Sequence, residues 1–96
     1  MSIASVSFGS VGGQTPAMSA SDVVSEVFTT SGSSQATASA TTASKPVVRI
    51  ASDVALYVSF GAAPDAANDA GRFYFPAGAL EYFIAGTGQK VALIEA

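Results

Sequence analysis

The chain has 96 residues, carries a net charge of −3 and contains neither cysteine nor histidine. A chain this short forms one domain and buries only about 60 to 65% of its unfolded surface, so self-association or docking on a larger partner would add stability. The missing His and Cys exclude Ser-His-Asp and Cys-His catalysis and ordinary zinc sites. We therefore expect no enzyme, no cofactor and no metal centre.

Basic side chains are too scattered to bind nucleic acid, which requires clustered cations. The four of them are Lys45, Arg49, Arg72 and Lys90. The longest apolar region, 47–63, is interrupted by charged residues and cannot span a bilayer, and the first residues lack the cations and apolar run of a signal peptide. We expect a soluble protein made in a cytoplasm, with no nucleic-acid or membrane partner.

The first segment, residues 1 to 21, has glycine and serine punctuation, one proline and no sustained hydrophobic period. Such a composition cannot bury enough apolar area to offset the entropy lost on ordering. We therefore expect a flexible, extended N-terminal arm that becomes ordered on a neighbouring subunit. Its apolar anchors would be Ile3, Val6, Phe8, Val11 and Met18.

From Asp22 on, β-branched and aromatic residues recur between turn sequences, which predicts strands. A strand over 23–30 leads into the turn SGSS and then into a polar second strand, QATASATTA. Pro46 opens a third strand, PVVRIAS, because proline at the first position removes no ladder hydrogen bond. Alternation then puts Val48 and Ile50 on one face.

The segment VALYVSFG alternates most regularly, with Leu56, Val58 and Phe60 on one face. The loop AAPDAANDAG follows it. Further strands are predicted over 72–75, 80–85 and 89–95, separated by turns at 76–78 and 86–88. The sequence thus predicts an all-β fold, a small antiparallel, jelly-roll-like sandwich or barrel over residues 22–96.

The stretch RFYFPAGALEYF contains five aromatic rings. Alternation turns Phe73 and Phe75 inward, where we expect them to form the core with Leu56, Val58 and Phe60. Leu80, Tyr82 and Ile84 share a face and can join that core. The opposite set would lie outside, where large apolar groups indicate a second buried contact with another subunit. That outward set is Tyr57, Tyr74 and Phe83.

Two loops invite a chemical interpretation. The acidic loop offers Asp65, Asn68 and Asp69 as calcium ligands, but their spacing does not match a calcium-binding loop. We interpret it as a polar connection built from turn-forming residues, and calcium stays open as the alternative. The segment GTGQK lacks the glycine spacing and the following helix of a phosphate loop, so it predicts a glycine-mediated hairpin.

Three successive segments resemble small phage and prophage virion proteins with a compact β-fold: SEVFTTSGSSQAT, KPVVRIASDVALYVSFGAAPDAA and FYFPAGALEYFIAGTGQKVALIEA. In those proteins a segment with VRI, YV and FG precedes an ending with PAG, EYF and GQKVALI in that order. The resemblance covers about residues 23 to 96, and none of its residues performs chemistry. It implies a structural component of a tailed-phage particle.

On this basis we expect a head decoration or cement protein, a homotrimer that binds the major capsid protein on the virion surface and stabilises the head. The alternative is a tail- or fibre-associated protein, including a receptor- or carbohydrate-binding module, although the chain has no Trp for sugar stacking. The residues expected to contact a partner are Ile3, Val6, Phe8, Val11, Tyr57, Tyr74 and Phe83.

Overall fold

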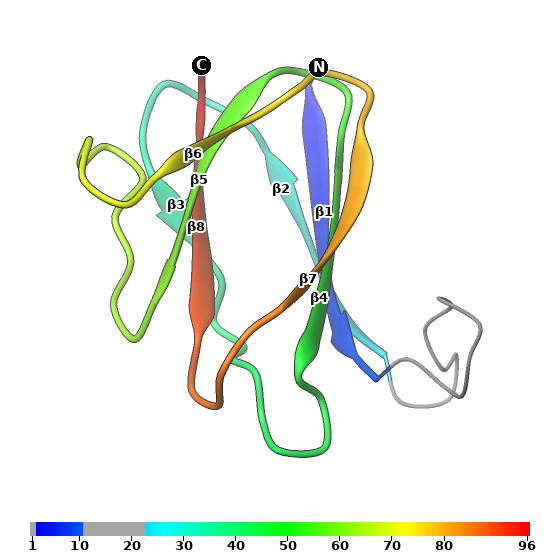
Figure 1. Ribbon diagram of the computed structural model, residues 1–96. Helices are drawn as coiled ribbons and strands as arrows, with labels where there is room; N and C mark the ends of the chain where they lie inside the picture. Colours follow the sequence, from blue (N-terminus) through cyan, green and yellow to red (C-terminus); the bar gives the residue numbers. More distant parts are fainter. Residues whose placement is uncertain (1, 11–22) are drawn as a thin grey trace.

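The computed structural model describes residues 2–10 and 23–96, which form two antiparallel four-stranded sheets packed as two layers (Figure 1). The strands are β1 (Ile3–Gly9), β2 (Val24–Thr29), β3 (Gln35–Ala36), β4 (Val47–Ser52), β5 (Leu56–Gly61), β6 (Phe73–Phe75), β7 (Leu80–Ile84) and β8 (Lys90–Glu95). The first sheet has the order β2-β1-β4-β7 and the second β3-β8-β5-β6. The predicted all-β antiparallel fold is confirmed, as a small sandwich. These residues contain no helix able to cross a membrane.

Strand β1 lies within the segment predicted to be a flexible arm, and for Ile3–Gly9 that prediction is wrong. β1 pairs with β2 on one side and with β4 on the other, so it is an interior strand of the first sheet. Its alternate residues Ala4, Val6 and Phe8 are buried in the core, while serines occupy two of the other four positions. The body therefore includes β1, and residues 11–21 of the predicted arm lie outside the described residues.

The core lies between the sheets and is built from alternate residues of both, as strand geometry requires. Leu56, Val58 and Phe75 are fully buried, which confirms their predicted place. Phe60 and Phe73 are partly buried and pack against the margin of the core. The remaining buried members of the cluster are Ala4, Val6, Phe8, Val48, Ile50, Val91 and Leu93.

The segment GTGQK joins β7 in the first sheet to β8 in the second, so it is not the hairpin that the sequence predicted. Buried Thr41 fixes this crossing. Its backbone carbonyl accepts the N–H of Gly88 at 2.8 Å, and its Oγ1 accepts the N–H of Gln89 at 2.9 Å and donates to the carbonyl of Gly86. Gly88 has φ of +82°, a conformation that favours glycine.

The polar segment QATASATTA contains only the two-residue strand β3. Beyond it, the N–H of Thr37 donates to the carbonyl of Val91 at 2.8 Å, and the Thr37 Oγ1 accepts the N–H of Val91 at 3.1 Å. A threonine hydroxyl therefore replaces a backbone carbonyl as the partner of β8, which ends the regular ladder early.

Candidate protein interface

Tyr57 and Tyr74, two of the predicted contact residues, are paired on the outer face of the second sheet. Their rings meet edge to face with centroids 6.0 Å apart. The Arg72 guanidinium carbon lies 4.0 Å from the ring centroid of Tyr57, and the same group donates to the carbonyl of Ala66 and pairs with Asp69. Tyr57 is therefore partly covered by the chain itself, whereas Tyr74 remains 57% exposed.

The acidic loop packs on this sheet through Ala66, which is fully buried and donates its N–H to Ser34 Oγ at 2.9 Å. Oδ1 of Asp65 and of Asn68 each accept a backbone N–H two residues further on, and Asp69 pairs with Arg72. These bonds confirm a polar connection built from turn-forming residues. Across 2–10 and 23–96, no three His, Cys, Asp or Glu residues are grouped to hold a metal ion.

The predicted contact residues of the N-terminal segment differ in where the structure places them. Val6 and Phe8 are buried in the core, which corrects their assignment to a partner contact. Ile3 is exposed on the outer face of the first sheet. Val11 lies outside the described residues.

Phe83 points inward, which corrects its predicted outward position. It lies opposite Val48 on the inner face of the first sheet. Its ring centroid is 5.5 Å from that of Phe60 and 5.3 Å from that of Phe73. Three phenylalanines from both sheets therefore meet at one margin of the core.

The residues on the other side of β7, expected to join the core, face outward instead: Leu80 is 52% exposed, Tyr82 41% and Ile84 87%. The segment LEYFI has large apolar residues at both odd and even positions, so alternation alone could not choose its inner face. Pairing with β4 decides which residues of β7 face the core, because Val48 and Ile50 of β4 point inward and lie opposite Phe83 and Glu81.

The outer side of the first sheet thus carries exposed apolar residues around one half-buried arginine, a surface that we call the β7 face. Cross-strand pairing aligns Val27, Ser5, Ala51 and Leu80 in one row. A groove of about 440 Å³ runs beside this row, between Ile3 and the residues just before β7. Large exposed apolar side chains gathered on one face indicate a protein contact. The β7 face consists of Ile3, Val27, Arg49, Leu80, Tyr82 and Ile84.

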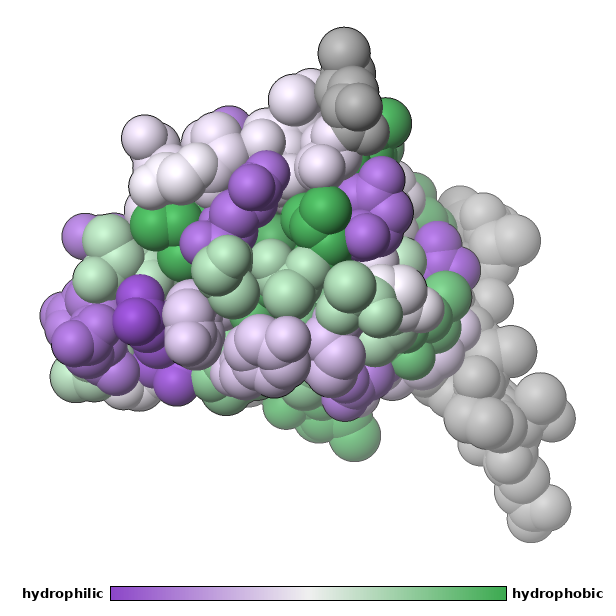
Figure 2. All heavy atoms as spheres, turned by 90° about the horizontal axis from the view of Figure 1, so that it is seen from above, coloured by the Kyte–Doolittle hydropathy of each residue, from purple (hydrophilic) through white to green (hydrophobic). Residues whose placement is uncertain are grey.

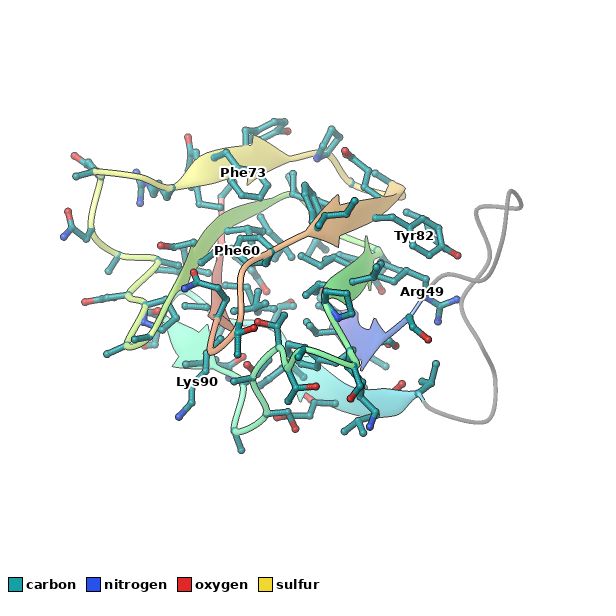
Figure 3. The ribbon with its side chains drawn as sticks, turned by 60° about the horizontal axis from the view of Figure 1, so that its bottom comes forward. Arg49, Phe60, Phe73, Tyr82 and Lys90 are labelled. Carbon is teal, nitrogen blue, oxygen red and sulfur yellow. The ribbon has the colours of Figure 1, made fainter. Side chains whose placement is uncertain are left out.

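Arg49 is the cation of the β7 face, directly paired with Tyr82 across the ladder. Figure 3 shows both side chains on the outer side of the first sheet. Arg49 forms no ion pair or side-chain hydrogen bond with the residues that the structure describes. Arginine and tyrosine are enriched at the centres of protein interfaces. A lone arginine in the apolar segment PVVRIAS was the sequence signal for this surface.

An aromatic slot of about 280 Å³ opens between the edge strands β6 and β7. Phe60 and Phe73 (Figure 3) stack with centroids 6.0 Å apart and planes 10° from parallel. Phe83 of the other sheet packs against both rings. Ile84 and Gln89 line the mouth together with the connection before β8. The slot is apolar apart from the Gln89 amide.

The opposite side of the sandwich, between β2 and β3, is closed by hydrogen bonds. The Glu26 carboxylate accepts the N–H groups of Ala38 at 3.1 Å and Ser39 at 2.8 Å. Burial alone would raise the pKa of Glu26, but these backbone bonds and the charge of Lys90 together lower it from its ordinary value. The carboxylate therefore stays ionised and ties the two sheets together.

The end of the sandwich at which β8 finishes has a different surface. Figure 2 looks onto this end and shows apolar and hydrophilic residues interleaved across it.

No protein-family model, curated protein or solved structure matches this chain. The β7 face and the aromatic slot bring together apolar side chains, one arginine and one glutamine. Proton transfer and nucleophilic attack need an acid–base pair or an activated nucleophile, and neither surface has one among the described residues. Their exposed apolar side chains are suited to contact with another protein.

Proposed function

We propose that this protein is an adhesive structural component of a tailed-phage particle, a head decoration protein that binds the major capsid protein. The observation that carries the proposal is the β7 face, where Leu80, Tyr82 and Ile84 are exposed beside Arg49, which has no ion pair with any described residue. The sequence resemblance over about residues 23 to 96 supports a virion partner.

The mechanism is adhesion rather than chemistry. A partner surface that covers the β7 face removes apolar area from water, worth about 25 cal/mol per Å². A protein that binds the assembled shell but not its free subunits stabilises the shell by mass action, by about 2.7 kcal/mol at one hundred times Kd. In the proposal the protein acts as a homotrimer, because three symmetric copies can bridge neighbouring capsid subunits.

Rebinding to shells stripped of the protein tests this proposal. We expect wild type to co-sediment with the shells and Tyr82→Ser to bind about 30-fold more weakly, because a central aromatic anchor is commonly worth 2 kcal/mol or more. Tyr74→Ser is the control, because Tyr74 is also an exposed tyrosine, 57% against 41% for Tyr82, and lies on the other sheet. Failure of the wild-type protein to bind stripped shells would refute the decoration role. Equal binding by Tyr82→Ser and wild type would show that the β7 face is not the contact surface.

The aromatic slot favours one alternative, a tail- or fibre-associated module that binds a receptor or carbohydrate. Its stacked Phe60 and Phe73 beside the Gln89 amide combine a ring surface with a hydrogen-bonding group. A glycan array with wild type and Phe73→Ala tests this alternative. Binding that Phe73→Ala abolishes would favour the tail module over shell decoration.

A further inference from the structure

We propose that β7 binds an extended strand of the partner polypeptide, which adds to the edge of the first sheet and places one apolar side chain in the aromatic slot. The inference rests on the proposed adhesive function and specifies how the partner is held. Its basis is that three features meet at one place: a strand edge and a carboxylate that are both unpaired among residues 2–10 and 23–96, and an apolar slot.

The outer edge of β7 has free backbone groups. Within the described ranges, β7 pairs with β4 alone and ends the first sheet. The N–H of Ala85 donates to the carbonyl of Pro46 at 3.0 Å, which fixes the phase of the ladder. Because hydrogen-bonded pairs alternate along an antiparallel ladder, the N–H and C=O groups of Leu80, Tyr82 and Ile84 point away from β4. A new strand can bond to these groups.

The aromatic slot lies on the side to which the inward residues of such a strand would point. Side chains that face each other across a ladder lie on the same face of the sheet. The residue opposite Phe83 would therefore enter the space between β6 and β7, beside Phe60 and Phe73. A cavity of about 150 Å³ holds a benzene molecule, so a slot of about 280 Å³ has room for an aliphatic or aromatic side chain.

Charge defines a second position of the incoming strand. Glu81 shares the inner face of β7 with Phe83, is exposed and forms no ion pair with any described residue. A lysine or arginine opposite Glu81 would supply its counter-charge. In an antiparallel strand that residue follows the apolar anchor by two positions, so the partner segment should read apolar, any residue, basic.

A second copy of β7 fits this edge less well. An antiparallel pair centred on Tyr82 uses the free groups of all three edge residues, but it places the copy's glutamate opposite Phe83. That arrangement brings a carboxylate to the apolar slot, and burying an unpaired charge is unfavourable. The geometry therefore favours a segment of another protein over symmetric pairing of two β7 strands.

Amide hydrogen exchange of the full chain by NMR, with the capped peptide TVTITKT as probe, tests the inference. Without peptide we expect fast exchange at Leu80, Tyr82 and Ile84 and slow exchange at Glu81 and Phe83. At saturating peptide the first three amides should slow at least about tenfold, since a new ladder protects them. The control peptides are TVTSTKT, which removes the anchor, and TVTITET, which reverses the charge and should bind about three- to fivefold more weakly.

Backbone blocking separates strand addition from side-chain docking. Tyr82→Pro removes an N–H that faces the open edge, a position at which proline is tolerated, whereas Tyr82→Thr keeps it. We expect Tyr82→Pro to bind the peptide at least about tenfold more weakly than Tyr82→Thr, since both variants lack the Tyr82 ring and differ in the backbone N–H. If Tyr82→Pro fails to fold, the same peptide N-methylated at its β7-facing residues gives the test on wild-type protein, and undiminished binding of that peptide would refute strand addition.

The outcomes distinguish the inference from the proposed function. The inference would be overturned if TVTITKT did not protect the edge amides. It would also be overturned if these amides became protected at higher protein concentration without peptide, because the occupant would then be another copy of the protein. Stripped shells that rebind normally in that case leave the decoration role standing. Edge protection by TVTITKT together with failed shell rebinding would support strand addition and reject the decoration role.

Discussion

The two sides of the sandwich are closed by different means. Between β2 and β3, the Glu26 carboxylate bonds to the backbone of Ala38 and Ser39. Between β6 and β7, Phe73 and Phe83 touch across the gap and leave a slot beside them. Directional bonds to a charged group fix one side in a single arrangement, whereas ring contacts on the other leave room for an added side chain. The open side is therefore where a partner can bind.

The edge strands differ in the same sense. An unpaired edge with apolar side chains is an aggregation hazard, and proteins often blunt such edges with inward-pointing charges. Glu26 on β2 is such a charge, held by the chain's own backbone. On β7 the corresponding inward charge, Glu81, has no ionic partner among the described residues. In the proposal above, a strand of the partner covers this edge of β7.

The largest expected effect tests the core that both sides share. Phe8 is fully buried, so Phe8→Ala should destabilise the protein by about 3 to 5 kcal/mol. Chemical denaturation followed by circular dichroism measures the change. A flexible arm in place of β1 would leave the denaturation midpoint unchanged, and that result would contradict the described fold.

Removing the Glu26 hydrogen bonds between β2 and the segment after β3 should lower the free energy of unfolding by less than Phe8→Ala does. Glu26→Ala deletes two hydrogen bonds to a charged acceptor, worth about 1 to 2 kcal/mol after allowance for its partial exposure to solvent. Glu81→Ala, on the open side, is the matched control and should change stability by less than about 0.5 kcal/mol. Equal losses in the two variants would remove the contrast between the sides.

Low pH should weaken the Glu26 hydrogen bonds that close the side between β2 and β3. The folded state lowers the pKa of Glu26 below its ordinary value of 4.5, so its contribution to stability is present above that value and is lost as pH falls through the folded pKa. Denaturation midpoints measured from pH 6 downward should therefore fall less steeply in Glu26→Gln than in wild type. Identical slopes would show that Glu26 does not couple folding to protonation.

The smallest effect on stability is expected at the β7 face. Ile84 is 87% exposed, so Ile84→Ser should change the free energy of unfolding by less than about 0.5 kcal/mol. The same substitution should weaken binding to stripped shells, measured by co-sedimentation. Clear destabilisation of the free protein would mean that Ile84 supports the fold rather than a contact.

Most strands were predictable because their residues alternate between apolar and polar character, as in β5 with Leu56 and Val58 on one face. β1 was missed since its outward positions include two serines and a glycine and the residues after it are glycine-rich, a composition shared with flexible segments. Its burial depends on pairing with β4, about forty residues away. Local composition does not reveal such a long-range partner.

The candidate site was only partly predictable, for a related reason. Tyr74 was correctly expected outside, because Phe73 and Phe75 on either side are the inward residues of β6. In β7 large residues stand at both sets of alternating positions, so only the pairing with β4 shows that Phe83 faces inward and Tyr82 outward. The aromatic slot combines residues from β5, β6 and β7, so it emerges only when the two sheets are assembled.

Hydrogen exchange with mass-spectrometric detection, on the free protein and on the protein bound to stripped shells, tests most directly that the partner binds at the open side. We predict that binding to shells slows exchange in residues 80–84 and leaves 72–75, with Tyr74 on the opposite sheet, unchanged. Protection of 72–75 with no change in 80–84 would place the contact on the second sheet and contradict the account.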